Sequence, residues 1–338
     1  MRIYSIDFFK LLFAYLIAFS HFGVNLPGVN IAVIFFFILS GYFLGKKFYH
    51  KRSTSEKNYS GVHYTIDHFK SLYPHYIFSL VVMFAYFLIK NIYLIISGSP
   101  SATTISNLFE RLYGLLPEIF LVQNIGFFDG GMNYPLWQVC ALLICGYFIY
   151  TMLCFNEKLS THLIFPLAII LIQTYLKSDV DIFGTVGMFY IPLIRAFSAL
   201  SFGVLICKFL RSDFYNNNIR KYKNTLNICS ILALISIFIG AYNIFLIVVF
   251  FIIAALVEPS SWLNKLFNKK MFKDFGAFSY CIYLNHALVI WFVKDIYNIF
   301  NINVSKWISC LFFFAVLTVY SFITKTIVDF FKNKIKLQ

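Results

Sequence analysis

Apolar segments of about 15 to 25 residues recur from one end of the chain to the other, and this repetition limits the fold more than any other feature. A helix of about 20 apolar residues is long enough to cross the hydrocarbon core of a bilayer. Hydrophobic residues make up 60% of the chain and charged residues 12%, far from the composition of a soluble domain. The sequence therefore predicts an all-α, polytopic membrane helix bundle.

We expect about ten transmembrane helices. The stretch 225–257 is too long for one span, because a single helix of that length would measure about 50 Å. The turn-like sequence at 240–243 divides it into two short spans. The expected spans lie near 7–24, 28–45, 72–94, 134–154, 162–176, 184–208, 225–240, 243–257, 277–294 and 306–328.

The net charge of +14 comes from short clusters of Lys and Arg between the apolar segments. This placement is typical of topology signals and argues against nucleic-acid binding. If ten spans alternate, most clusters fall on the side of both termini, so we expect both termini to be cytoplasmic. We expect a single transmembrane domain over 1–338 without an appended soluble domain, and an interfacial or re-entrant helix within 112–122.

Three ionisable residues lie in the first expected span: Asp7, Lys10 and His21. Charged groups are costly inside a membrane, so each is a functional candidate. Helical periodicity places all three on one face, with Lys10 and His21 about 16 Å apart along the axis. We expect them at two depths of one polar channel, with Asp7 and Lys10 toward the cytoplasm. The alternative is an Asp7–Lys10 ion pair near the interface and a His21 that caps a helix end.

Arg195, His286 and Glu118 are further ionisable residues in apolar segments, and Arg195 lies close to mid-span. A mid-span arginine must meet an anion or a water-filled cavity. His286 and Glu118 could equally be satisfied structural groups. No spacing typical of metal ligands occurs, and the seven cysteines indicate neither a disulfide framework nor a metal site. We expect the remaining histidines to be solvated in loops: His50, His63, His68, His75 and His162.

Five short motifs follow one another in chain order. The first is Lys10 followed by His21 after ten intervening residues. The others are 36–43 (FFILSGYF), 70–74 (KSLYP), 133–137 (NYPLW) and 275–286 (FGAFSYCIYLNH). In this order they resemble the motifs of the acyltransferase 3 family, the multispan bacterial enzymes that O-acylate surface glycans and similar acceptors. This chain has Lys10 where the family has arginine, which keeps the charge but lacks the planar fork of a guanidinium.

The resemblance implies transfer of an acyl group, usually acetyl, from coenzyme A to a hydroxyl of a cell-surface polysaccharide, lipid-linked glycan or similar acceptor. His21 would be the general base, with a transient acyl-histidine as the open variant. The other expected catalytic residues are Lys10, Asp7 and Arg195. The residues expected to bind the acyl-CoA donor are Ser40, Gly41, Lys46, Lys47 and Lys70. The residues expected to bind the acceptor are Asn133, Trp137, Tyr280, Tyr283 and His286.

The same resemblance places the protein in the bacterial cytoplasmic membrane, with acyl-CoA, the acceptor and the lipid bilayer as its partners and no permanently bound cofactor or metal. Self-association stays open. Two other functions also stay open: a transporter or flippase for a lipid-linked saccharide, and a membrane subunit without catalytic activity. Inverted repeats with paired broken helices would favour the transporter, and the sequence shows no such symmetry.

Overall fold

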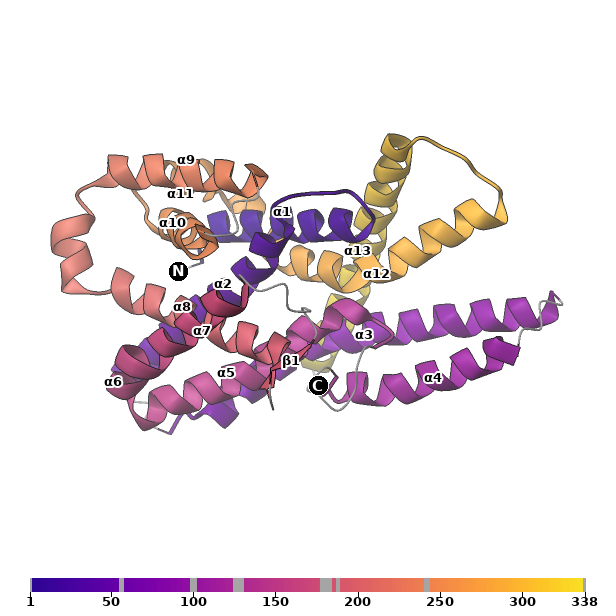
Figure 1. Ribbon diagram of the computed structural model, residues 1–338, viewed down its shortest axis with the longest axis horizontal. Helices are drawn as coiled ribbons and strands as arrows, with labels where there is room; N and C mark the ends of the chain where they lie inside the picture. The colour runs from indigo at the N-terminus through magenta and orange to yellow at the C-terminus, as the bar shows by residue number, and fades with distance from the viewer. Residues whose placement is uncertain are drawn as a thin grey trace.

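The computed structural model describes residues 2–54, 58–97, 102–123, 131–176, 184–186, 189–239 and 244–336. Within these ranges the chain is almost wholly helical (Figure 1). The first half contains α1 (Tyr4–His21), α2 (Val29–Ser53), α3 (Gly61–Ile96), α4 (Ala102–Ile119), the 3₁₀ turn η1 (Tyr134–Leu136), α5 (Trp137–Phe155), α6 (Glu157–Leu159), the π-helical turn η2 (Ser160–Ile164) and α7 (Phe165–Leu176).

The second half begins with the antiparallel pair β1 (Thr185–Val186) and β2 (Phe189–Tyr190), in which Thr185 pairs with Tyr190 and Val186 with Phe189. The helical elements that follow are α8 (Ile191–Leu210), η3 (Tyr215–Ile219), α9 (Lys223–Ile239), α10 (Phe245–Val257), α11 (Trp262–Phe267), η5 (Lys270–Phe272), α12 (Phe275–Ile299) and α13 (Lys306–Lys336).

Six described helices are long and apolar enough to cross a membrane. They are Val29–Ser53, Gly61–Ile96, Tyr134–Phe155, Ile191–Leu210, Lys270–Ile299 and Lys306–Lys334. The all-helical, multi-pass membrane fold is therefore confirmed, while the count of ten and the orientation of the termini stay predictions. The stretch 225–257 forms two helices, α9 and α10, as expected, and the turn predicted at 240–243 lies outside the described residues.

Two expected boundaries are wrong. The span expected at 184–208 begins as β1 and β2, and α8 starts at Ile191 with a proline in its first turn, where a missing backbone N–H costs nothing. The span expected at 72–94 begins at Gly61, because Ser60 and His63 form a capping box that starts α3 earlier. The motif at 70–74 therefore lies inside a helix.

Helices α2 and α8 cross backbone to backbone, and two glycines make this possible. A Cβ on Gly41 would lie 2.0 Å from the carbonyl oxygen of Leu200, and one on Gly203 would lie 1.9 Å from that of Ile38. Small residues let membrane helices approach backbone to backbone. Gly41 is therefore a packing residue of this crossing, and it fixes the position of the neighbouring Ser40.

A second pair, α1 with α12, runs in parallel, and α13 returns alongside α12 (Figure 1). The start of α1 contacts the start of α12, since a Cβ on Gly276 would lie 2.1 Å from Oδ1 of Asp7. Near the other end, the rings of His21 and His286 lie 5.2 Å apart. The α1–α12 pair therefore links two polar regions at different depths of the bundle.

Candidate functional site

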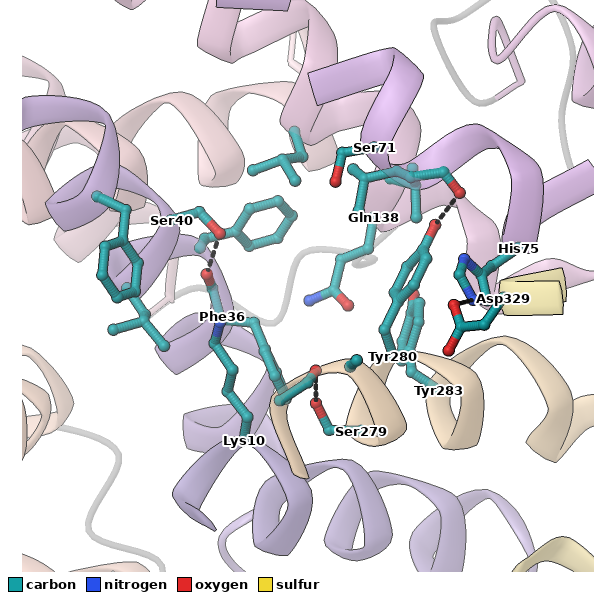
Figure 2. A pocket seen from close by; sticks show the side chains of 18 of the residues that line it. Lys10, Phe36, Ser40, Ser71, His75, Gln138, Ser279, Tyr280, Tyr283 and Asp329 are labelled. Atoms are coloured by element: carbon teal, nitrogen blue, oxygen red, sulfur yellow. Dashed lines mark hydrogen bonds and ion pairs between the residues drawn. The ribbon is translucent and has the colours of Figure 1, made fainter. Parts of the chain in front are cut away.

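A cavity of about 400 Å³ lies between α1, α2, α3, α5, α12 and α13 (Figure 2). Its walls combine residues from both ends of the chain, so it exists only once the bundle has formed. Its polar and charged lining residues are Lys10, Ser40, Ser71, His75, Gln138, Ser279, Tyr280, Tyr283, Asp329 and Lys332. It lies at the end of the bundle that holds the start of α1 and the end of α13, which the charge pattern predicts to be cytoplasmic.

Lys10 projects from α1 into this cavity, toward the turn of α2 that carries Ser40 (Figure 2). Its ammonium lies 5.3 Å from the ring centre of Phe43, a cation–π distance. Among the described residues no hydrogen-bond or ion-pair partner contacts this ammonium. Ser40 is already bonded, because its hydroxyl donates to the carbonyl of Phe36 over 2.8 Å. The cavity thus contains a positive charge that is free to meet an anion.

The wall formed by α3 and α13 carries charges of both signs. His75 lies 3.4 Å from a carboxylate oxygen of Asp329, and the ammonium of Lys332 donates to the carbonyl of Ser71 over 3.1 Å. His75 was expected in a solvated loop, and that expectation is wrong: it lies within α3 and its side chain is 11% exposed. His75 is shielded because α13 packs against this turn of α3 and brings Asp329 and Lys332 to it.

Tyr280 and Tyr283 close the cavity on the side of α12. The hydroxyl of Tyr280 donates to the carbonyl of Leu72 over 3.4 Å, and the hydroxyl of Tyr283 donates to the carbonyl of Pro135. Both tyrosines line the cavity. Tyr283 also contacts His286 beyond the cavity, with ring centres 5.8 Å apart.

His21 lies on the other side of Tyr283, outside the cavity lining. Its Nδ1 shares a hydrogen bond with the hydroxyl of Tyr134 over 3.1 Å. Its ring centre lies 5.2 Å from those of both Tyr134 and His286. We call these three side chains the His21 cluster. The structure therefore places Lys10 and His21 in two neighbouring polar regions, where the sequence predicted one channel.

His286 is completely buried, and its two ring nitrogens differ. Nδ1 lies 2.6 Å from the carbonyl oxygen of Tyr283, one turn earlier in α12. A carbonyl can only accept, so Nδ1 carries the proton and Nε2 presents a lone pair. Among the described residues this Nε2 has no partner, and it lies in the cluster beside His21.

The segment that carries Tyr134 is held by buried polar contacts. The backbone N–H of Asn133 donates to Oε1 of Glu118 over 2.9 Å, and its side-chain amide donates to the carbonyl of Leu284 over 3.0 Å. Gly131 lies so close to Glu118 that a Cβ there would be 2.3 Å from Oε1. Glu118 and Asn133 therefore brace this segment against α4 and α12.

Two residues expected to be catalytic, Asp7 and Arg195, lie outside both the cavity lining and the His21 cluster. Asp7 is ion-paired to Arg2 over 2.7 Å, where the alternative interpretation expected a pair with Lys10, and it packs on Gly276. Arg195 is 7% exposed in α8 and does not line the cavity. Trp137 also lies outside the cavity lining, with its ring 5.8 Å from that of Phe37.

The cations expected to hold the donor are distributed along the predicted cytoplasmic face. Lys47 is ion-paired to Asp67 over 2.7 Å, and Lys46 and Lys70 do not line the cavity. The hydroxyl of Tyr59 donates to the same Asp67 over 2.6 Å. Burial, together with this hydrogen bond, raises the pKa of Tyr59, so its phenol stays neutral.

Gln138 is a cavity residue that sequence reasoning missed. Its side-chain nitrogen donates to the carbonyl of Val33 over 3.1 Å, which ties α5 to α2. It follows Trp137, the last residue of the NYPLW motif, so the motif pointed to the right segment. Tyr134, within that motif, was not singled out either. Among the described residues, no group of three or more His, Cys, Asp or Glu side chains is placed to hold a metal ion.

The bundle is thus a multi-pass membrane protein with a cation-lined cavity next to a pair of histidines. A family profile described as "Acyltransferase domain" matches residues 3–325, nearly the whole chain. The chain belongs to the acyltransferase 3 family.

Curated relatives are similar over a short segment. Proteins named as putative O-acetyltransferases from Staphylococcus aureus strains COL, MSSA476 and N315 are each 39% identical over 61 residues. That segment is 18% of this chain and 10% of each relative, so the chain spans about a tenth of the length of these relatives. No solved structure matches the chain.

Proposed function

We propose that the protein is an O-acyltransferase that moves an acyl group, most simply acetyl, from acyl-CoA to a hydroxyl of a surface glycan or lipid-linked saccharide, with His21 as general base. The observation that carries this proposal is the pairing of two polar regions across Tyr283. The Lys10 cavity lies on one side and the His21 cluster on the other. Tyr283 and His286 are one helical turn apart, a rise of about 4.5 Å.

The donor would occupy the cavity from the predicted cytoplasmic side. Coenzyme A carries several phosphate charges, and the ammonium groups of Lys10 and Lys332 both line this space. Lys10 has no described ion-pair partner to displace, so its charge is available to a phosphate or to the oxyanion that forms during transfer. The apolar lining from Phe36, Phe37, Leu39 and Leu142 suits the narrow arm that ends in the thioester.

The chemistry assigned to His21 is one proton transfer in each direction. The imidazole takes the proton of the acceptor hydroxyl while that oxygen bonds to the thioester carbonyl carbon. The tetrahedral intermediate then breaks its carbon–sulfur bond, and the thiolate of coenzyme A receives the proton from the imidazolium. The products are an ester and free coenzyme A, and no other reactant is required.

In this mechanism Tyr283 moves before the reaction, since it lines the cavity and its ring contacts His286 of the His21 cluster. We propose that the arm of the donor displaces the Tyr283 side chain. The acceptor then binds at the exposed side of the His21 cluster, where the hydroxyl of Tyr134 lies. The protein would work in the bacterial cytoplasmic membrane, where acyl-CoA is supplied from the cytoplasm.

The test is acyl transfer by membranes that contain the protein, supplied with labelled acetyl-CoA and extracted glycans or lipid-linked sugars. His21→Ala should abolish labelling of the glycan at an unchanged protein level. His162→Ala is the matched control, because His162 is exposed and its Nδ1 contacts the carbonyl of Lys158 within its own turn. Label transfer by the His21→Ala protein at the wild-type rate would refute the assignment. Saccharide movement without label incorporation would indicate a transporter.

A further inference from the structure

We infer that Tyr134 is a positioning residue that fixes the protonation pattern of His21, so that Nδ1 keeps its proton and Nε2 stays free to act as the base. The inference rests on the proposed function of His21 and adds the group that makes this imidazole competent. It starts from the hydrogen bond of 3.1 Å between the Tyr134 hydroxyl and Nδ1 of His21.

A neutral imidazole has one nitrogen that donates and one that accepts. If Nδ1 carries the proton, it donates to the phenolic oxygen of Tyr134 and Nε2 is available to a substrate hydroxyl. If Tyr134 donates instead, the proton lies on Nε2 and His21 cannot act as a base there. Tyr134 is 37% exposed, so its own O–H can donate outward while its oxygen accepts from Nδ1.

The 3₁₀ turn η1 is suited to this task because three hydrogen bonds fix its position against α4 and α12. The carbonyl of Pro135 accepts from the hydroxyl of Tyr283. Asn133 donates through its backbone to Glu118 and through its side chain to Leu284. Proline also restricts the backbone of the turn itself. A rigid η1 holds the phenolic oxygen at a constant distance from His21.

His286 makes the choice of protonation pattern matter. Its Nε2 is a buried lone pair without a described partner, in the ring that lies 5.2 Å from His21. If a His21 protonated on Nε2 turned this nitrogen toward His286, the buried lone pair would accept its hydrogen bond and draw His21 away from the substrate. Tyr134 and His286 therefore compete for the proton of His21, and Tyr134 favours the active arrangement.

Nitrogen NMR of protein labelled with ¹⁵N-histidine measures this arrangement directly, because protonated and bare ring nitrogens have distinct shifts. The chain has seven histidines, and the signal missing from His21→Ala identifies His21. In the wild-type protein at a pH where His21 is neutral, we expect the proton mainly on Nδ1. In Tyr134→Phe the ratio of Nδ1–H to Nε2–H should fall about two- to tenfold, the equilibrium change expected for one neutral hydrogen bond.

Tyr15→Phe is the matched control, since it removes another hydroxyl that bonds from α1, in this case to Thr318 over 2.7 Å. It should leave the His21 ratio unchanged. If Tyr134→Phe does not fold, 3,5-difluorotyrosine at position 134 keeps the shape but makes the phenol a better donor. It should shift the proton toward Nε2.

An unchanged ratio in Tyr134→Phe, or a proton on Nε2 in the wild-type protein, would overturn the inference. Because this measurement needs no substrate, its failure is separate from failure of the proposed function, which the His21→Ala transfer assay decides. Where transfer is observed, Tyr134→Phe should lower kcat by about the same factor and leave the KM for acetyl-CoA unchanged.

Discussion

Replacing Gly203 with alanine should force α2 and α8 apart. The added Cβ would lie 1.9 Å from the carbonyl oxygen of Ile38 and 2.6 Å from the backbone nitrogen of Tyr42. Both are backbone atoms of α2, so no side-chain rotation can relieve the contact. The helices must separate by about 1.5 Å to lengthen the 1.9 Å contact to the 3.4 Å at which ordinary van der Waals contact begins.

Overpacking of this kind costs about 1–3 kcal/mol, and the collision with several backbone atoms places Gly203→Ala at the upper end, about 3 kcal/mol. The separation also displaces Ser40, which precedes the contact residue Gly41 and lines the cavity. We therefore expect a lower melting temperature in detergent together with a higher KM for the acyl donor.

Gly45→Ala is the matched control, because Gly45 lies in α2 one turn after Gly41 and faces α8 in the same helix pair. A Cβ there would lie 3.1 Å from the Cβ of Cys207, a contact that a small shift relieves. This variant should unfold close to the wild-type temperature. Gly203→Ala and Gly45→Ala proteins with equal melting temperatures would refute the close-crossing argument, because it predicts a cost only where the backbones touch.

Three other predictions concern charged side chains. Lys10→Met removes one charged contact to the donor and should raise the KM for acetyl-CoA about tenfold or more. It should not lower the melting temperature, since no described residue bonds to the ammonium of Lys10. A KM equal to that of the wild-type protein would contradict this prediction. Asp7→Asn should lower the melting temperature by weakening the 2.7 Å ion pair with Arg2 but leave kcat unchanged; a large loss of kcat in stable protein would make Asp7 catalytic instead. Lys90→Met should destabilise the protein by about 1–3 kcal/mol, because Asp295, paired with Lys90 over 2.7 Å and 20% exposed, loses its counter-charge. The double variant Lys90→Asp with Asp295→Lys should restore part of the stability in the same melting assay. No recovery would argue against a simple ion pair between these two residues.

Hydrophobic length was enough to predict an all-helical membrane bundle, because apolar runs and their breaks are local properties of the chain. Helix starts were less predictable. The capping box of Ser60 and His63 extends α3 past the expected boundary, and β1 with β2 replaces the expected start of α8. Such starts depend on side-chain hydrogen bonds and strand pairing, which hydropathy does not register.

The candidate site was predicted where a residue's type was unusual for its surroundings. Lys10 attracted attention as a charge in an apolar helix, and it does line the cavity. His75 and Gln138 did not, because nothing local distinguishes them: the partner of His75, Asp329, is 254 positions away in the chain. The role expected for Lys47 stays a prediction, and its pairing with Asp67 could not be read from the local sequence because the two residues are 20 positions apart.

The tyrosine between the cavity and the histidines has a consequence for the cell as well as for catalysis. A continuous water-filled path through the bundle would let protons and ions run down their gradients and dissipate the membrane potential. In the proposed mechanism Tyr283, whose hydroxyl donates to the carbonyl of Pro135, would close this path until the donor binds. Opening this seal only when a donor's own arm fills the gap would let the two compartments exchange an acyl group while the membrane stays electrically tight.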